Sequence, residues 1–285
     1  MKKILILAAV LTVSFTSCRI YDPLYDGGLM LTTEWSERTE GVAIPDSYHV
    51  RLSTYSATHT EASRLVDHPF DPATHRLHIW HPAQGITVEG TVATVGEHAE
   101  EPQQTRQEHG GVIAGNPEWL FTCAMDAQIG GAAYQQHIAP MRQQVRQLTF
   151  IIRATGGSAG RIEGISGVLT GAAKSLDFDT DEHTVPSDVG LKFEKNADGD
   201  WQATVRLLGV TGERQLLSAR IAFADGAPEE IALNSDLVEE LTDFNVDKKT
   251  PLTLVAQLVE TPSGAGFTAT IEAWERIERG GVIAD

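Results

Sequence analysis

A serine in a glycine-rich run is the first stretch of this sequence that could do chemistry. Residues 156–160 read Gly-Gly-Ser-Ala-Gly, the pattern of the nucleophile elbow of hydrolases. An elbow needs a strand before the serine and a helix after it, so that Ser158 stands on a strained turn. Residues 148–154 alternate as a strand does, but Gly164 and Gly167 make the residues after the serine poor helix material. A glycine-rich hairpin turn is therefore the better interpretation.

Three histidines could gather a metal ion if they shared a helix. His75, His78 and His81 stand three residues apart. Pro82 and the alternating apolar residues around them predict a strand instead, where residues three apart point to opposite faces. Surface or partly buried histidines are expected, and no metal site.

Three aspartates resemble the start of a calcium-binding EF-hand loop. Asp177, Asp179 and Asp181 have the spacing, but the loop needs Gly at its sixth position and Glu at its twelfth. Here those positions hold Glu182 and Asp188. A solvated acidic loop is the favoured interpretation, with adventitious Ca²⁺ binding as the alternative, because neighbouring carboxylates suit a hard cation.

Two further candidates are weaker. Residues 171–175, Gly-Ala-Ala-Lys-Ser, have the wrong glycine spacing for a phosphate-binding P-loop. Cys123 lies in the apolar run 119–125, which favours a buried apolar side chain over a catalytic thiol. With no catalytic constellation, we expect that the protein is not an enzyme and has neither a metal nor a cofactor.

Period-two alternation of apolar residues predicts short strands along most of the chain. They are expected at 29–35, 48–52, 77–79, 86–92 and 118–125, and then at 148–152, 191–193, 201–207, 217–223, 252–258 and 267–273. The strongest hairpin is centred on Asp198-Gly199, a dipeptide typical of tight turns. A short helix is expected over 236–244, since Asp236 can cap it and the apolar residues fall on one face.

The spacing of these strands predicts an all-β fold of two tandem β-sandwich domains, with one short helix in the second. The domains are expected at 28–130 and 141–285, with a linker at 131–140. Residues 96–117 lack periodicity and apolar mass, and are expected to form a long exposed loop.

The first eighteen residues have the order of a secretory signal peptide: basic Lys2 and Lys3, an apolar core, then mostly small residues before Cys18. The apolar core is shorter than the roughly 20 residues that span a bilayer. The ending resembles the lipobox of bacterial lipoproteins. That resemblance implies a signal peptide at 1–17, acylation of Cys18 by chains such as palmitate, and a tether at 18–27. The alternative is a plain signal peptide cut elsewhere, with Cys18 an ordinary thiol.

The net charge limits the classes of molecule that this protein is expected to bind. It is −17 for the whole sequence, and loss of Lys2 and Lys3 makes the mature chain two charges more negative, at −19. Such a chain is repelled by phosphate backbones, so no nucleic-acid partner is expected. There is no second long apolar run, so the N-terminal lipid is the expected contact with a membrane.

Several short motifs resemble one family. They are Glu34-Trp35-Ser36, residues 81–88 (His-Pro-Ala-Gln-Gly-Ile-Thr-Val), 161–168, 243–247 and the closing 266–274. Together they resemble Bacteroidota lipoproteins related to the minor and anchor subunits of fimbriae. The resemblance implies two transthyretin-like β-sandwich domains and fimbrial subunits as partners. Only the lipidated cysteine transfers as a functional residue, and it falls on Cys18. Related pilins assemble by strand exchange and can be processed after an arginine, but one Arg38 in a polar loop does not support cleavage here.

The expected function is that of a cell-surface lipoprotein of the outer membrane, a minor or anchoring subunit of a fimbria. The alternative is a surface glycan-binding lipoprotein of a polysaccharide-uptake system, which would stack sugars on exposed aromatic side chains. Its candidate residues are Trp35, Trp80, Trp119, Trp201 and Trp274, with Trp80 the one expected to be exposed.

Overall fold

The computed structural model describes residues 28–97, 111–130, 134–154, 159–224, 230–263 and 266–278. The signal peptide, Cys18, the tether and Ser158 lie outside these ranges. Within them the chain is all-β apart from one 3-10 turn, Ala159–Arg161, which confirms the all-β part of the predicted fold. No part of the described chain forms a helix of the length and apolar character that would cross a membrane.

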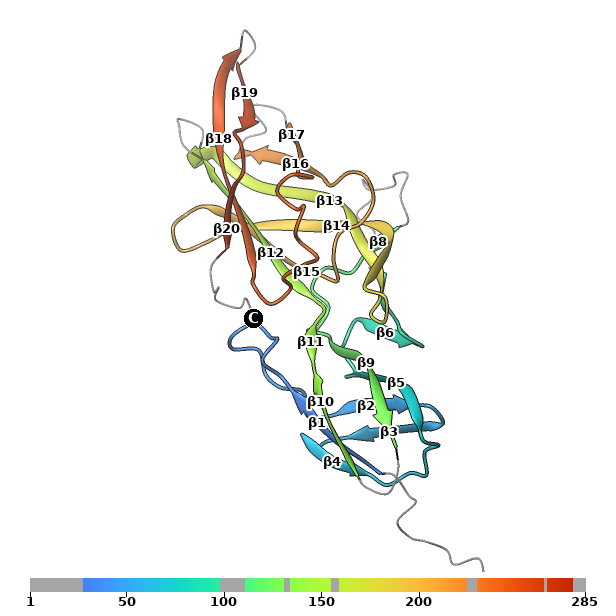
Figure 1. Cartoon of the computed structure of the whole chain (residues 1–285). Coiled ribbons are helices and arrows are strands. Elements are labelled where there is room, and N and C mark those ends of the chain that lie inside the picture. The colour runs from blue at the N-terminus through green and yellow to red at the C-terminus, as the bar shows by residue number, and fades with distance from the viewer. Residues whose placement is uncertain are drawn as a thin grey trace, which may run out of the picture.

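Two small sheets form the N-terminal part of the molecule (Figure 1). One has the strand order β10-β1-β4 and the other β11-β9-β5-β2-β3. The strands are β1 Leu29–Glu34, β2 Tyr48–Leu52, β3 Tyr55–His59, β4 Ser63–Val66, β5 Ala73–Trp80, β9 Phe121–Ile129, β10 Gln135–Pro140 and β11 Arg142–Gln143.

The smaller hydrophobic core is built from the inward residues of both sheets, which gives a sandwich-like pair. Leu29 and Leu31 of β1 and Val50 of β2 are fully buried, and the residues between them are partly exposed. Val50 pairs with Ile79 of β5 in the antiparallel register. A slip of one residue would turn every apolar side chain to the solvent face, so burial on one face sets the register.

A third, larger sheet forms the rest of the molecule, in the order β17-β16-β13-β14-β15-β12-β18-β19. Four further strands attach to it: β20 to β18, β7 to β13, β6 to β7 and β8 to β14. Its strands are β6 Ile86–Glu89, β7 Val92–Val95, β8 Val112–Ile113, β12 Arg146–Ala154, β13 Ile162–Asp177, β14 Glu182–Lys195, β15 Trp201–Leu207, β16 Leu216–Phe223, β17 Ile231–Asp236, β18 Leu252–Ser263, β19 Gly266–Ile271 and β20 Glu275–Glu278.

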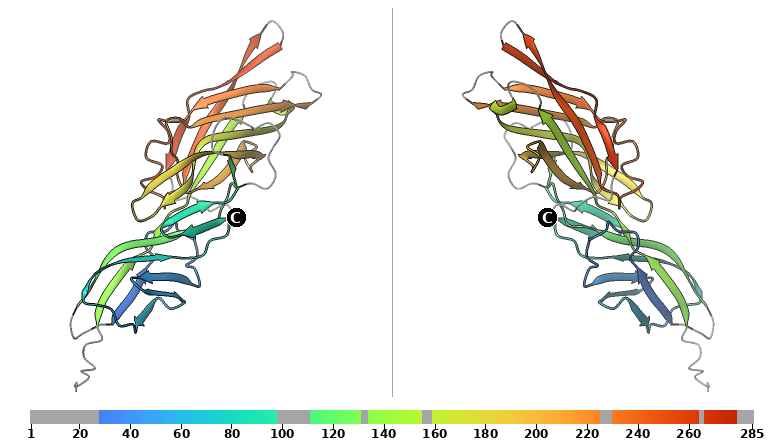
Figure 2. Two further views of the ribbon diagram at one scale, coloured as in Figure 1. Left: turned by 90° about the vertical axis from the view of Figure 1, so that its right-hand side faces the viewer. Right: turned by 90° about the vertical axis from the view of Figure 1, so that its left-hand side faces the viewer.

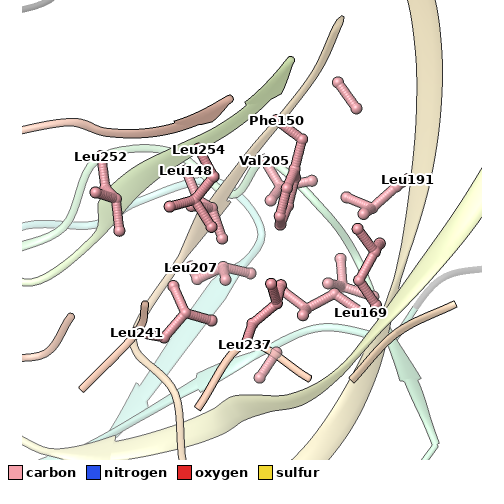
Figure 3. Packing of buried hydrophobic residues seen from close by; sticks show 14 of the residues in the cluster. Leu148, Phe150, Leu169, Leu191, Val205, Leu207, Leu237, Leu241, Leu252 and Leu254 are labelled. Carbon is pink, nitrogen blue, oxygen red and sulfur yellow. The ribbon is translucent and has the colours of Figure 1, made fainter. Parts of the chain in front are cut away.

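The larger core is built from the inward residues of this sheet. Leu148 and Phe150 of β12 are fully buried beside Val205 of β15 and Leu254 of β18, and Figure 3 shows these side chains in one shared space with Leu241. Full burial of each such side chain is worth about 1.5–3 kcal/mol. The core therefore depends on the central strand β12, which pairs antiparallel with β15 and parallel with β18.

The two parts are joined by more than the chain between them. Both views in Figure 2 show an elongated molecule with the two bodies end to end. The hairpin β6–β7 extends from the N-terminal half and pairs with β13, with Leu176 opposite Ala93.

One strand was expected at 86–92, but Gly90, at a φ of 66°, turns the chain back. Residues 135–140, within the expected linker, form β10.

The helix expected over 236–244 is replaced by successive turns. The N–H of Leu241 donates to the carbonyl of Leu237 (3.0 Å), and that of Phe244 to the carbonyl of Leu241 (3.0 Å). Three members of the predicted apolar face are buried, at most 1% exposed, whereas the fourth, Val238, is 37% exposed. The carbonyl of Phe244 accepts a hydrogen bond from Arg146 instead of continuing a helical ladder.

Candidate functional site: a polar cleft between the two cores

A cleft of about 760 Å³ lies where the N-terminal sheets meet the larger sheet. Such junctions between bodies are common places for binding sites. Most of the lining side chains are polar, and both signs of charge are present. The lining residues are Glu34, Ser36, Glu37, Thr122, Cys123, Ala124, Met125, Ile138, Pro140, Arg142, Gln143, Gln144, Phe178, Asp181, Asn245, Val246, Asp247, Lys248 and Lys249.

Gln143 is the centre of hydrogen bonding at this junction, and it is only 4% exposed. Its Oε1 accepts from the N–H of Thr39 (2.8 Å). Its Nε2 lies 2.8 Å from the carbonyl of Val145 and 2.7 Å from that of Lys248. Thr39 Oγ1 in turn donates to the carbonyl of Lys249 (2.7 Å). One amide side chain thus joins the loop after β1, the start of β12 and the chain around Lys248.

Lys248 reaches across the junction from the other side. Its ammonium donates to Gln144 Oε1 (3.0 Å) and lies 3.0 Å from His183 Nε2 on β14. A third group, Asp181 Oδ1, is 3.8 Å away. Gln144 Nε2 donates onward to Thr122 Oγ1 of β9 (2.8 Å). This relay of hydrogen bonds runs from β14 of the larger sheet to β9 of the N-terminal part.

Burial changes the protonation chemistry of both basic groups. Removal from water lowers the pKa of the Lys248 ammonium to about 8, against the opposing effect of Asp181. Burial, and then the positive charge of Lys248, lower the pKa of His183 to about 4. At neutral pH His183 is therefore uncharged, and its Nε2 accepts the hydrogen bond from Lys248.

Arg146 is buried next to this relay at the start of β12, with its side chain 1% exposed. Its Nε donates to the carbonyl of Thr250 (2.7 Å) and its NH1 to that of Phe244 (3.0 Å). The guanidinium lies over the Phe244 ring, 5.0 Å from its centroid. Its NH2 faces the Glu278 carboxylate at 3.5 Å. Arg146 thereby holds the turns 237–250 and β20 to the central strand.

A second contact between the two parts comes from the turn after β13. Phe178 is 7% exposed and packs against Trp80 and His78 of β5, at ring-centroid distances of 6.4 Å and 6.1 Å. Next to it, Asp179 Oδ1 forms an ion pair with Arg76 NH2 (2.6 Å). This turn was predicted as a solvated acidic loop. It is instead a contact surface, because its apolar member is buried and its carboxylate has a cation on β5.

Gly209 packs closely against His183 and Asn245 at this junction, so a larger side chain there should destabilise the protein. A Cβ added there would lie 2.5 Å from Asn245 Oδ1 and 2.7 Å from His183 Nε2. Neither side chain is free to move away, since Asn245 bonds both the N–H and the carbonyl of Val210 (2.9 and 2.8 Å) and His183 bonds Lys248. We expect Gly209→Ala to lower the free energy of unfolding by about 1–3 kcal/mol, as overpacking does.

Urea unfolding followed by circular dichroism would measure this loss. Gly190→Ala on β14 is the matched control, because a Cβ there meets nothing within 4 Å. Its unfolding free energy should stay within about 0.5 kcal/mol of the wild type, as for surface substitutions in general. Equal losses in the two variants would mean that His183 and Asn245 do not constrain Gly209.

The structure separates the three histidines that the sequence placed at metal-ligand spacing. The hydrogen bond of His75 goes to the carbonyl of Asp71, just before the start of β5. His78 lies on the opposite face of β5, 3.3 Å from Asp179. His81 is buried and accepts the N–H of Phe121 at its Nδ1 (3.1 Å). The strand interpretation is confirmed, and no group of three or more metal-ligating side chains comes together in the described part of the chain.

The P-loop-like residues 171–175 lie inside β13, where Gly171 has a φ of 76° at an irregularity in the pairing with β14. The carboxylates that resemble the start of an EF-hand loop also have other partners. Asp177 accepts the N–H of Asp179 (3.0 Å), and Asp181 is directed to Lys248. None of these residues is placed as its motif would require.

Cys123 is a buried thiol on β9, 3% exposed, and burial raises its pKa to about 11. A thiol that is neither exposed nor ionised is unreactive. We expect that Cys123, in a Cys18→Ala form where it is the only thiol, reacts with Ellman's reagent only as fast as the protein unfolds. A rapid reaction of the folded protein would show that solvent reaches β9 through the cleft.

All five tryptophans are described, and they do not form an open platform for sugars. Trp35, Trp201 and Trp274 are buried, at 7%, 6% and 9% exposure. Trp80 was expected to be exposed, but it is only partly so and has the Arg51 guanidinium 5.6 Å from its ring centroid. Trp119 is covered in the same way by Arg206.

The polar side chains of the cleft join the two parts of the molecule to each other. Gln143, Gln144 and Lys248 are buried polar residues whose side-chain atoms bond elements far apart in the chain, and each such bond is costly to break when its partner stays buried. The sequence offered no signal for them, because glutamine and lysine in a loop are ordinarily exposed. They are found only when the two parts of the molecule are seen together.

Comparisons with known proteins find solved structures with a similar fold. No family model matches the sequence, and no curated protein matches it. Among solved structures, the chain is similar to a candidate adhesin from Bacteroides ovatus, with a TM-score of 0.60 and 13% identity over 91% of this chain and 98% of that one. It is also similar to candidate polysaccharide-binding proteins from Bacteroides thetaiotaomicron, with a TM-score of 0.56 and 10% identity over 88% and 98%.

A third similar structure is the fimbrial anchor protein Mfa2 from Porphyromonas gingivalis. Its TM-score is 0.53 at 11% identity, over 89% of this chain and 98% of that one. At these identities the comparisons show a shared fold. The family resemblance seen in the sequence is confirmed at that level.

Proposed function

We propose that this protein is a lipid-anchored cell-surface protein of the adhesion and fimbrial class, acting as a minor or anchoring subunit of a fimbria. The observation that carries the proposal is the fold, which matches that of a fimbrial anchor along nearly its whole length. The N-terminal sequence supports it, because a signal peptide that ends at Cys18 would place the chain on a membrane.

The proposal includes two tandem transthyretin-like β-sandwich domains, at 28–130 and 141–285 with 131–140 between them. Two separate hydrophobic cores support this division. The hairpin β6–β7 and β8 pair with the larger sheet, so the first domain reaches into the second. Such interlocking suits a subunit that must transmit force from a fibre to a membrane, because the two cores cannot separate without breaking strand pairs.

The partners proposed are the outer membrane, through acyl chains on Cys18, and other fimbrial subunits. Deleting the gene in its own host and counting fimbriae by electron microscopy tests this role. We expect fewer, detached or abnormally long fimbriae, restored by the wild-type gene. Fimbriae of unchanged number, length and attachment would contradict it.

A glycan-binding lipoprotein of a polysaccharide-uptake system is the second candidate. Its support is the fold of the polysaccharide-binding candidates from Bacteroides thetaiotaomicron. The covered tryptophans weigh against stacking of sugars on an aromatic platform. Affinity electrophoresis in gels that contain host or plant polysaccharides tests it, and retardation of the protein would favour this function over the fimbrial one.

A further inference from the structure

We infer that His183, Lys248 and Gln144 form an acid-sensitive latch, which holds the segment 245–250 across the cleft at neutral pH and releases it when His183 takes up a proton. The latch is separate from the anchoring role, and neither Cys18 nor a fimbrial partner is needed for it. Its parts come from β14, the segment itself and the junction before β12.

In the closed latch His183 must be uncharged. Its Nε2 is 3.0 Å from the Lys248 ammonium, which has hydrogens to donate and no lone pair to offer. Protonation of His183 would replace this hydrogen bond by two positive charges at contact distance. Lys248 has no alternative position, because the same ammonium bonds Gln144 (3.0 Å) and is only 6% exposed.

The surroundings of His183 compensate this repulsion only in part, through Asp181 and the backbone carbonyls of Leu208 and Asp181. The charged groups that act on it are Lys248 and Asp181, and Asp181 is 73% exposed, so water screens its attraction. Gly209, which is uncharged, packs closely against the His183 ring, since a Cβ there would lie 2.7 Å from Nε2. Asp247 and Lys249 line the cleft further out.

The direction of the effect follows from the two pKa values of His183. Its pKa is about 4 in the closed latch, and about 6.5 is ordinary for a histidine released to water. The open state therefore binds more protons between these values, so the latch is stable above pH 6.5 and weakens as the pH falls. Between pH 7.5 and pH 5 the opening constant should rise about 30-fold.

The N–H of Val210 reports this opening directly. It donates to Asn245 Oδ1 (2.9 Å), so it is freed when the segment 245–250 leaves. We would measure hydrogen–deuterium exchange of this amide by NMR in the Cys18→Ala form, at pH 7.5 and pH 5, corrected for intrinsic exchange. The wild-type latch predicts that the opening constant rises about 30-fold.

His183→Gln is the decisive variant, because its amide oxygen can accept from Lys248 and does not titrate. The rise should shrink to less than about threefold in this variant. His75→Gln is the matched control, since His75 bonds to the carbonyl of Asp71 four residues before it, and it should behave as the wild type. Lys248→Met removes the repulsion by another route but leaves His183 buried, so it should reduce the rise without abolishing it, and the test survives if His183→Gln fails to fold.

Global unfolding is distinguished by the amide of Phe150, which lies in the fully buried centre of β12. Its exchange should not follow that of Val210. A Val210 amide with no pH-dependent opening, or one whose opening keeps its full rise in both His183→Gln and Lys248→Met, would overturn the proposal. Exchange of Val210 and Phe150 in parallel would overturn it as well.

Discussion

Replacing Cys18 by Ala is expected to move the protein from the membrane fraction to the soluble fraction without changing its fold. Each acyl CH₂ buried in a bilayer contributes about 0.8 kcal/mol, and stable attachment takes at least two chains. The mature chain has no compensating attraction to anionic lipids, because its net charge is strongly negative. Detergent phase separation with Triton X-114 would measure the partition.

The same experiment includes a test of the tether. Thermal unfolding of the Cys18→Ala protein should match that of the lipidated protein, because residues 18–27 have little apolar periodicity to contribute to a core. A variant that remains in the detergent phase would show that something other than acyl chains holds it. A much lower melting temperature would show that the N-terminus packs into the fold.

Arg146→Ala is expected to have the largest effect on stability, about 3–5 kcal/mol of lost unfolding free energy from unpaired buried carbonyls and a cavity. The substitution leaves the carbonyls of Phe244 and Thr250 without their buried donor. It also removes one of the two cations beside the Glu278 carboxylate, since Arg276 still pairs with it. It also opens a cavity beside the Phe244 ring. Urea unfolding of the purified protein would measure the loss.

Two control variants separate the loss of the buried Arg146 contacts from the loss of a surface ion pair and from the loss of side-chain volume. Arg153 lies on the same strand as Arg146 and forms a surface ion pair with Asp200. Arg153→Ala removes this pair, and such pairs are worth about 0–1 kcal/mol. Arg146→Met fills the space without the charge, and it should cost less than Arg146→Ala if the cavity matters. Equal stability of the Arg146→Ala and Arg153→Ala proteins would contradict the structural role assigned to Arg146.

The sequence was most informative where one face of a strand is buried and the other is exposed to solvent. Leu29 and Leu31 in β1, and Trp201 to Leu207 in β15, alternate in sequence and in burial alike. The turn at Asp198-Gly199 was also correctly predicted, and Asn196 Oδ1 accepts the N–H groups of Asp198 and Asp200 there (3.0 Å each). In these places local propensity and tertiary burial point the same way.

The sequence failed where pairing and burial depend on distant parts of the chain. Strands β3 and β4 are polar, and they form because β2 and β1 supply their hydrogen bonds. The carbonyl of Phe244 is taken by Arg146, a partner 98 residues away, where a helix had been expected. Gln143 and Lys248 are polar residues in irregular segments, and no local pattern predicts that two bodies will close over them.

The fraction of fimbriae that mild shear releases from cells is the most direct test of the central claim. Cells whose only copy carries Cys18→Ala should shed several-fold more fimbriae into the medium than wild-type cells, because the fibre would lose its lipid attachment. Gly190→Ala cells serve as the control and should retain fimbriae as the wild type does. Equal retention of fimbriae by Cys18→Ala cells, with the variant protein itself in the soluble fraction, would contradict the anchoring role.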